Sequence, residues 1–354
     1  MMGQADLIIL VLLAVVSGIA VYGLSGRAAA KLWLTDKVKA RSNHRQPASR
    51  AGGLVITLVI LVATGVASLL GWPLPPTLAV IALVAAGIGL LDDISDIPAR
   101  MKMAAFVVLC GFASIYTGPL GHIPLPFGPG ISLPEPVGYV LAALFLFGFL
   151  NAFNFMDGLN GMAAGGGMIG LSVLLVLFAP SNGGIVILYV ITAAALYGFA
   201  VRNLLKGGIF LGDAGSLGVA MLLGAGALHA GQARPEAVYV FAIAFIPFLL
   251  DVVYTFCRRA MRGARVFDAH KEHIYQRLRA EGWSHQAVSA AYALLILNGG
   301  IAAITLPARY GAFGLWTAGV LTTALCVFVW RGMFGLRARP DGQPSSAQDP
   351  QASA

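Results

Sequence analysis

Apolar residues fill most of this chain in long runs, which short polar or glycine- and proline-rich connections separate. Each run holds about 18 to 20 apolar residues, the length that an α-helix needs to cross the hydrocarbon core of a bilayer. The runs predict eleven membrane spans, at residues 6–24, 53–71, 77–94, 102–118, 136–153, 163–179, 184–201, 215–232, 237–257, 288–306 and 314–331. This pattern is typical of an all-α polytopic membrane protein.

Composition supports the same class of protein. Hydrophobic residues make up 58% of the chain and charged residues only 11%, so lipid is the solvent for most of it. Cys110, Cys257 and Cys326 all lie inside apolar runs without metal-ligand spacing, and we interpret them as small core residues. We expect one transmembrane domain over residues 1–335 and a disordered cytoplasmic tail, rich in Pro, Ser and Gln, over residues 336–354.

The basic residues predict the orientation of the chain in the membrane. With the N-terminus outside, the inner connections and the tail hold 21 of the 23 Lys and Arg residues, and the outer connections hold only Arg234 and Arg309. Because cytoplasmic loops are enriched in basic residues, we predict a periplasmic N-terminus and a cytoplasmic C-terminus. Apolar residues alternate in the outer connection 121–134, which predicts a short hairpin there.

The acidic residues gather at the predicted cytoplasmic ends of the spans. In the sequence LLDD, Asp92 and Asp93 are adjacent carboxylates that repel one another and lose hydration beside a membrane. A cation usually offsets such a cost. Asp157 and Asp213 also lie at cytoplasmic span ends, whereas Asp96 is interpreted as a solvated loop residue. A site rich in oxygen atoms on this face suggests a hard ion such as Mg²⁺, which takes one or two carboxylates together with phosphate oxygens and water.

A second polar motif is NAFNFMDGLNG, in which Asn151, Asn154, Asp157 and Asn160 recur every third residue. In a straight helix this series turns by about 60° per step, which would place Asn151 and Asn160 on opposite faces. The span is therefore predicted to end inside the motif, at its glycines, and to present amides and a carboxylate to a polar ligand. The alternative is that the asparagines only join neighbouring helices by hydrogen bonds.

A third motif, DAHKEHIYQRLRAEGW, follows the ninth predicted span. On a helix His270, His273 and Arg277 would lie within an arc of about 60°, and Ile274 and Leu278 would lie on another face. The segment is predicted to be an amphipathic helix at the membrane surface that binds anions. Ordinary surface polarity remains an alternative, whereas zinc is disfavoured because Arg277 would repel it and no third ligand lies nearby.

Together these motifs resemble those of a known family. LLDD, NAFNFMDGLNG, the segment from Asn203 to Ser216 with its sequence FLGDAGS, and AHKEHIYQR resemble the polyprenyl-phosphate N-acetylhexosamine-1-phosphate transferases, glycosyltransferase family 4. The resemblance covers nearly the whole chain, with four motifs in the family's order on one membrane face. The basic segment RSNHRQPASRAGGL and the form AHKEHIYQ resemble the branch that initiates O-antigen and exopolysaccharides.

The resemblance implies a reaction in the bacterial inner membrane. A UDP-N-acetylhexosamine would transfer its sugar-1-phosphate to undecaprenyl phosphate, release UMP and start a lipid-linked surface polysaccharide of O-antigen type. Mg²⁺ would be the cofactor, with Mn²⁺ as an alternative. The partners would be these two substrates and the lipid bilayer, without nucleic acid, and a homodimer is left open. We expect UDP-GlcNAc or a 6-deoxy relative as donor, and not UDP-MurNAc-pentapeptide.

The resemblance also implies roles for individual residues. Asp213 and Asp92 are the expected metal ligands. The expected catalytic residues are Asp92, Asp93, Asp157, His270 and His273. The expected substrate-binding residues are Asn151, Asn154, Asn160, Asn203, Phe210, Arg277, Arg41, His44 and Arg50.

Asn203 and Phe210 match positions that hold uracil, and Gly212 and Gly215 would let the chain turn at Asp213. For Asp92 and Asp93 we favour organisation of the lipid phosphate and the metal, with a base or a covalent nucleophile as alternatives. Gln276 departs from the family, which has a third histidine at that position.

Two other functions stay open at this point. One is an enzyme similar to phospho-MurNAc-pentapeptide translocase, and the other, of a different class, is a secondary transporter or flippase. A transporter needs polar residues near the midplane that open to both sides in turn. Here the polar residues lie at one face, which favours the enzyme. Asp251, inside the ninth span, is the acid without an assigned role, except as a buried partner for a cation.

Overall fold

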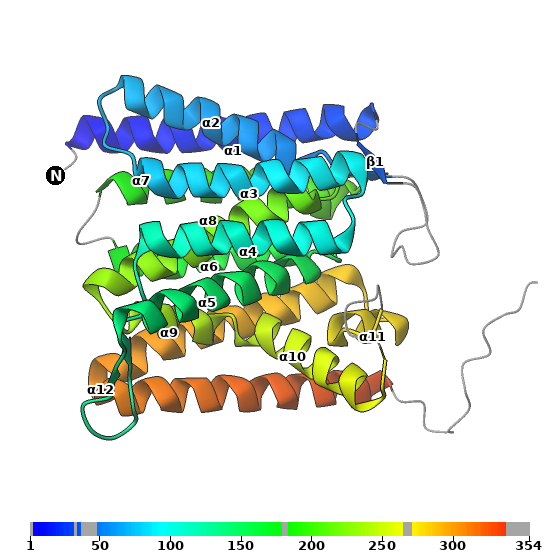
Figure 1. The fold of residues 1–354 in the computed structure, drawn as a ribbon. Coiled ribbons are helices and arrows are strands. Elements are labelled where there is room, and N and C mark those ends of the chain that lie inside the picture. Colours follow the sequence, from blue (N-terminus) through cyan, green and yellow to red (C-terminus); the bar gives the residue numbers. More distant parts are fainter. Residues whose placement is uncertain (1–2, 32–33, 37–47, 179–182, 265–270, 338–354) are drawn as a thin grey trace, which may run out of the picture.

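The computed structural model describes residues 3–31, 34–36, 48–178, 183–264 and 271–337, which form one bundle of helices (Figure 1). The helices are α1 (Gln4–Ala30), α2 (Gly52–Leu69), α3 (Pro76–Ser95), α4 (Ala99–Thr117), α5 (Glu135–Phe155), α6 (Met162–Phe178), α7 (Gly183–Lys206), α8 (Gly212–Ala233), α9 (Ala237–Ala244), α10 (Ile246–Met261), α11 (Ile274–Ala280) and α12 (His285–Arg337). The strands are β1 (Thr35–Asp36), β2 (Ala48–Ser49), β3 (His122–Ile123) and β4 (Ile131–Ser132). Each predicted span overlaps one of these helices or part of one, except the span 237–257, which covers both α9 and α10.

The bundle is that of an all-α polytopic membrane protein, as predicted. Within the described residues, eight helices are long and apolar enough to cross a membrane, or up to nine if the bent pair α9–α10 forms one span. Helix α1 exposes much of its apolar surface, including Leu7, Ile8 and Ile19, whereas α8 is buried over most of its length. Exposed apolar faces of this size fit a lipid environment. The count of eleven spans stays a prediction, as does the domain boundary near residue 335, and the tail from residue 338 lies outside the described residues.

The ninth predicted span is not one straight helix. Helix α9 ends at Ala244, α10 begins at Ile246, and their axes differ by 67°. Pro247 lies in the first turn of α10, and its ring and missing N–H do not allow a regular helix to continue through this point. The predicted span 237–257 therefore corresponds to a bent pair of helices, and whether the pair forms one span stays a prediction. The interpretation of Cys257 as a core residue was wrong, because it is exposed on α10, whereas Cys110 and Cys326 are buried.

The last long helix consists of two halves that lie side by side. Gly311, with φ 56° and ψ −141°, interrupts α12, and Pro307 precedes this break. Nε1 of Trp283, just before the first half, donates to the carbonyl oxygen of Met333 in the second half at 3.2 Å. The chain therefore reverses direction at Gly311, between the two spans predicted at residues 288–306 and 314–331.

Two short hairpins complete the fold. Strands β3 and β4 pair antiparallel, with His122 opposite Ser132, which confirms the hairpin predicted in the connection 121–134. Strands β1 and β2 pair antiparallel in the first connection that follows α1. In Figure 1, β1 and α11 lie at one end of the bundle and the N-terminal end of α1 lies at the other. The candidate site occupies the end that carries β1 and α11.

Candidate active site

The predicted acidic motifs meet at one place in the structure. The end of α3 supplies Asp92 and Asp93, the turn after α5 supplies Asp157, and the first turn of α8 supplies Asp213. These segments are far apart in the sequence, yet their side chains share hydrogen bonds or electrostatic interactions. The site is thus a cluster of four carboxylates between the ends of three helices.

Lys102, in the first turn of α4, joins two of these carboxylates. Its Nζ donates to Oδ2 of Asp92 at 2.8 Å and to Oδ2 of Asp213. Only 15% of its side chain is exposed, so the ammonium is held between the acids and not in bulk solvent. The sequence analysis missed Lys102 as a site residue. A useful signal was its place in an apolar span, where a charge is costly unless it is paired.

The two adjacent aspartates have different partners. Both oxygens of Asp93 accept backbone N–H groups at the start of α8, from Asp213 at 3.1 Å and from Ala214 at 3.0 Å. A carboxylate at a helix N-terminus satisfies exposed N–H groups and interacts favourably with the helix dipole. Asp92 instead contacts Lys102 and accepts the N–H of Ile97 at 2.9 Å. Asp93 therefore fixes α8, and Asp92 belongs to the charged pair around Lys102.

The carboxylate of Asp213 is held from two sides. Nδ2 of Asn154 donates to its Oδ1 at 3.0 Å and to Oγ of Ser216 at 2.8 Å, while Lys102 binds Oδ2. Asn154 lies in the last turn of α5, so this contact ties the end of α5 to the start of α8. The prediction that Asn154 binds substrate stays open, and its observed contact is with the expected metal ligand.

Asp157 adds a further negative charge to the cluster. Burial, and after it the charges of Asp213 and Asp93, raise the pKa of the Asp157 carboxyl well above its usual range, although the N–H of Gly212 donates a hydrogen bond to it. Desolvation and neighbouring like charges both disfavour the ionised form of a carboxyl group. The cluster as a whole is therefore suited to receive a cation.

The NAFNFMDGLNG motif contains the end of a helix, as predicted. Helix α5 ends at Phe155, and Gly161 has φ +80°, which favours glycine, just before α6 begins. We expected Gly158 to let the chain turn, but the structure shows another reason for glycine at this position. A Cβ at Gly158 would lie 2.1 Å from the hydroxyl oxygen of Tyr275, so a larger residue would collide with α11.

Three asparagines of the expected substrate-binding set make hydrogen bonds within the protein. Oδ1 of Asn203 accepts the N–H of Gly161 at 2.7 Å, and its Nδ2 donates to the carbonyl oxygen of Ile209 at 2.7 Å. Asn160 donates to the carbonyl oxygen of Asn203 at 3.2 Å. Asn151 donates to Phe147 in its own helix at 2.7 Å. These contacts position the loops around the site, and roles in substrate binding stay predictions.

The loop before α8 is bound to the first connection of the chain. Phe210 donates its N–H to the carbonyl oxygen of Ser49 at 2.7 Å, and Gly53 donates to Leu211 at 2.7 Å. The predicted uracil contact of Phe210 stays a prediction. Gly212 has φ +72°, so it does turn the chain at Asp213.

Gly215 has another role than the predicted turn. It lies inside α8 and is buried, and a Cβ built on Gly215 would lie 2.8 Å from the Cα of Gly53 in α2. Small residues at such a point let two helices approach closely. Gly215 therefore lets α2 pack against the first turn of α8, next to Asp213.

The histidine motif differs from the amphipathic helix that the sequence predicts. Helix α11 begins only at Ile274, and His273 is the residue before it, with 4% of its surface exposed. Gln276 accepts the N–H of His273 at 3.2 Å and so caps the helix. The face with Ile274 and Leu278 is buried in the protein, so the prediction that it lies on the membrane surface was wrong.

The basic residues of the prediction are only partly placed. The guanidinium of Arg277 lies over the ring of Phe334, with its carbon 4.9 Å from the ring centre. Nη1 of Arg50 lies 3.9 Å from Oδ1 of Asp96, whose side chain is 70% exposed. Arg41, His44 and His270 lie outside the described residues, so their roles stay predictions.

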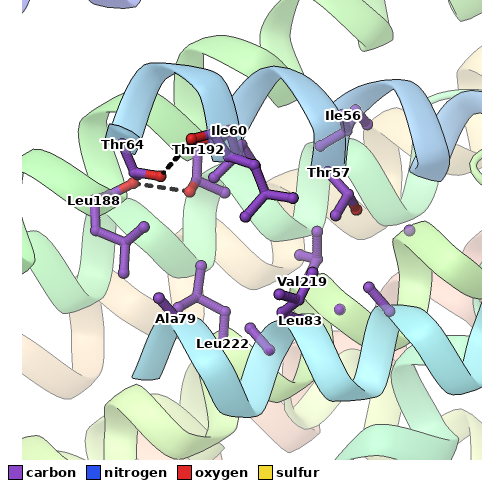
Figure 2. A pocket seen from close by; sticks show the side chains of 15 residues that line it. Ile56, Thr57, Ile60, Thr64, Ala79, Leu83, Leu188, Thr192, Val219 and Leu222 are labelled. Atoms are coloured by element: carbon purple, nitrogen blue, oxygen red, sulfur yellow. Dashed lines mark hydrogen bonds between the residues drawn. The ribbon is translucent and has the colours of Figure 1, made fainter. Parts of the chain in front are cut away.

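A separate crevice between α2, α3, α7 and α8 is apolar (Figure 2). Two of its three threonines turn their hydroxyls to their own helices, as Thr64 donates to Ile60 at 2.7 Å and Thr192 donates to Leu188 at 2.8 Å, and no charged side chain lines it. The crevice therefore lacks the charged groups that a phosphate-bearing ligand requires. The carboxylate cluster is the candidate site for such a ligand.

The donor set of the cluster fits Mg²⁺ in kind. Within the described parts of the chain, no group of three or more His, Cys, Asp or Glu side chains lies close enough to hold a metal ion alone. Asp92 and Asp213, however, are close enough to share the ammonium of Lys102, and Mg²⁺ commonly binds one or two protein carboxylates and completes its shell with water and phosphate oxygens. An ion held by these two acids would thus take further ligands from a bound phosphate substrate.

Comparison with known proteins identifies the class. The sequence model of Glycosyl transferase family 4 matches residues 75–231, which include the carboxylate cluster. The decaprenyl-phosphate N-acetylglucosaminephosphotransferase of Mycobacterium leprae is 30% identical to the chain over 305 residues, 75% of each protein. That of Mycolicibacterium smegmatis is 30% identical over 351 residues, which cover 88% of this chain and 83% of the relative.

A relative from another lineage agrees. The undecaprenyl-phosphate alpha-N-acetylglucosaminyl 1-phosphate transferase of Escherichia coli K12 is 27% identical over 304 residues, 81% of this chain and 80% of the relative. The chain therefore belongs to glycosyl transferase family 4 and is a multi-pass membrane enzyme of that family.

Proposed function

We propose that this protein transfers N-acetylglucosamine-1-phosphate from UDP-GlcNAc to undecaprenyl phosphate and releases UMP. The observation that carries the proposal is the cluster in which Lys102 joins Asp92 and Asp213 at the end of a membrane bundle. The relatives named above act on decaprenyl or undecaprenyl phosphate and on N-acetylglucosamine, which supports the same substrate classes for this chain.

The site chemistry suits phosphoryl transfer. The donor diphosphate and the lipid phosphate bring several negative charges together, so the reaction depends on positioning and charge neutralisation. Lys102 carries a positive charge into the cluster, and Asn154 holds Asp213 in one orientation. Lys102 contacts both acids that would hold an ion, so its ammonium lies where it would bind the substrate phosphates.

Mg²⁺ is the proposed cofactor, with Mn²⁺ as an alternative, and Asp213 and Asp92 are the residues that would hold it. When bound, the ion would neutralise the donor diphosphate and orient it for attack. A phosphate monoester has a second pKa of about 6, so the lipid phosphate is largely dianionic at neutral pH and gains little from a base. We therefore assign a positioning role to Asp93, whose two oxygens already bind the start of α8.

The pathway and the exact donor belong to the proposal as well. We propose that the lipid-linked product initiates a surface polysaccharide of O-antigen type. UDP-GlcNAc is favoured over UDP-MurNAc-pentapeptide because the relatives are named for N-acetylglucosamine. The enzyme is proposed to lie in the inner membrane with its C-terminus in the cytoplasm, which places the cluster on the side that supplies UDP-sugars.

Reporter fusions test this orientation. A fusion at Pro124, in the outer connection, is expected to report the periplasm, and one at Arg262, after α10, is expected to report the cytoplasm. If both fusions report the same side, the proposed topology is wrong.

Reconstituted protein tests the reaction. Purified enzyme with UDP-GlcNAc, undecaprenyl phosphate and Mg²⁺ is expected to release UMP in proportion to lipid product, and omission of the lipid or addition of EDTA is expected to stop it. A competition with UDP-MurNAc-pentapeptide at equal concentration separates the two branches of the family. UDP-sugar uptake into liposomes without UMP release would instead support a transporter.

A further inference from the structure

Asp251 is a buried acid that the proposed reaction does not use. It lies in α10, one turn after Pro247, and its side chain has 0% exposure. A charged group inside a membrane protein is costly unless several partners compensate it. The contacts of Asp251 show which parts of the protein it serves.

The carboxylate joins three helical segments. Its Oδ1 accepts the N–H of Ile274 at 2.8 Å and lies 3.2 Å from Nδ1 of His273. Its Oδ2 accepts the hydroxyl of Tyr292 at 2.5 Å and the N–H of Tyr275 at 3.2 Å. Asp251 in α10 therefore holds the start of α11 and the first half of α12 in one place.

A carboxylate is the side chain that this arrangement requires. A carboxylate accepts at both oxygens, whereas the amide nitrogen of asparagine is a donor and would face either Tyr292 or a backbone N–H. A buried donor that loses its acceptor costs much more than an exposed one. The substitution Asp251→Asn, which removes the charge, therefore preserves the size of the side chain but disrupts the hydrogen bonds that its two oxygens accept.

Through α11 these contacts reach the active site. The hydroxyl of Tyr275 donates to the carbonyl oxygen of Phe155 at 3.1 Å, and Phe155 is the last residue of α5, two positions before Asp157. The same hydroxyl occupies the space beside Gly158, where a Cβ would lie 2.1 Å away. The ring of His273 also packs against Phe155, with centres 5.9 Å apart.

A second set of contacts, which does not involve Asp251, joins α10 to the segment just before α11. Arg259, further along α10, pairs with Glu272, and Nη1 of Arg262 lies 4.0 Å from Oε2 of Glu272. Glu272 lies just before α11, so these arginines join α10 to the segment at a point separate from the contacts of Asp251. Loss of Asp251 is therefore expected to release Tyr275 without detaching the whole segment.

We infer that Asp251 is a positioning residue that sets the turn carrying Asp157, and that it acts through the backbone and hydroxyl of Tyr275. The inference rests on the proposed function in one respect, namely that this turn receives the nucleotide-sugar. Asp251 touches no reacting atom. It holds the start of α11, whose Tyr275 packs against the turn 156–161.

The test uses the full-length protein in nanodiscs and measures hydrogen exchange, which does not depend on activity. Asp251→Asn is expected to raise exchange in peptides covering 272–280 and 155–161. Tyr275→Phe removes the hydroxyl that binds Phe155 and interacts with Gln276 but leaves the contacts of Asp251 with α11, so it is expected to raise exchange in 155–161 more than in 272–280. Thr255→Val is the matched control, since Thr255 donates only a 3.3 Å hydrogen bond to Asp251, and it is expected to change neither peptide.

Kinetics then separate positioning from general stability. Asp251→Asn is expected to raise the KM for UDP-GlcNAc about tenfold and to leave the KM for undecaprenyl phosphate unchanged. Tyr275→Phe is expected to raise the KM for UDP-GlcNAc by a smaller factor. The double variant is expected to have the same KM as Asp251→Asn alone, because the effects of two residues that act through the same contacts are not additive. Additive effects, or equal changes in both KM values, would contradict the inference.

The outcomes also separate this inference from the proposed function. If the wild type transfers no sugar phosphate, the proposed function fails, yet the exchange data still decide whether Asp251 controls the turn 155–161. If Asp251→Asn does not accumulate as folded protein, Tyr275→Phe decides alone. Unchanged exchange in 155–161 for Tyr275→Phe overturns the inference.

Discussion

Two buried acid clusters in this protein differ in how their charge is compensated. Around Asp213 one lysine side chain, Lys102, joins two carboxylates, and 25% of the Asp213 side chain remains exposed. Around Asp251 the donors are two backbone N–H groups, a histidine, a tyrosine and, at 3.3 Å, a threonine, and the exposed fraction of the side chain is 0%. In the proposed mechanism a substrate or an ion binds at the first cluster, whereas the partners of the second come from helices that would have to move. We therefore distinguish the two proposed roles by solvent exposure and by the kind of donor. Asp213 is partly exposed and paired with a lysine side chain, whereas Asp251 is buried and held by backbone N–H groups.

The largest effect is expected at the open cluster. Asp213→Asn preserves the shape of the side chain but removes its charge and one oxygen donor, so UMP release is expected to fall about 10²- to 10⁴-fold. Asp96→Asn is the control, because Asp96 is 70% exposed, and its activity is expected to stay close to that of the wild type. A fully active Asp213→Asn enzyme would remove the basis of the proposed metal site.

A smaller loss is expected for the cation in the same cluster. Lys102→Met keeps an unbranched side chain of similar bulk but leaves Asp92 and Asp213 without their shared donor, and UMP release is expected to fall about 100-fold. Arg100, an exposed cation two residues earlier, provides the matched control in Arg100→Met. Equal activities of the two variants would show that Lys102 is an ordinary surface cation.

The smallest effect is expected where the two clusters meet. Gly158→Ala would place a Cβ 2.1 Å from the hydroxyl oxygen of Tyr275, so either the turn or α11 must shift. Overpacking of this kind costs about 1–3 kcal/mol, and we expect a lower melting temperature and about a tenfold loss in kcat/KM. Gly165→Ala in α6 is the control, since nothing lies within 4 Å of its Cβ, and it is expected to be neutral. A Gly158→Ala protein identical to wild type would contradict the close contact between the turn and α11.

The positions of most helices, and the end of the bundle that carries the acids, could be predicted from the sequence alone. Span length and hydrophobicity are local properties, so α1 to α8 begin and end close to the predicted bounds. The glycine-rich motif after α5 marked the helix end correctly, and the alternating residues of 121–134 predicted the hairpin. The order of motifs was also enough to recognise the family.

The groups that the acids contact could not be predicted from the sequence, because they depend on how the helices pack. Lys102 and Asp213 are 111 residues apart, and no spacing rule joins them until α3, α4 and α8 pack together. The need for glycine at Gly158 likewise depends on Tyr275, which lies in a different helix. Asp251 had no role in the linear chain because its donors come from α11 and α12. Helix formation in a membrane depends on nearby residues, whereas the partner of a buried charge depends on which helices meet.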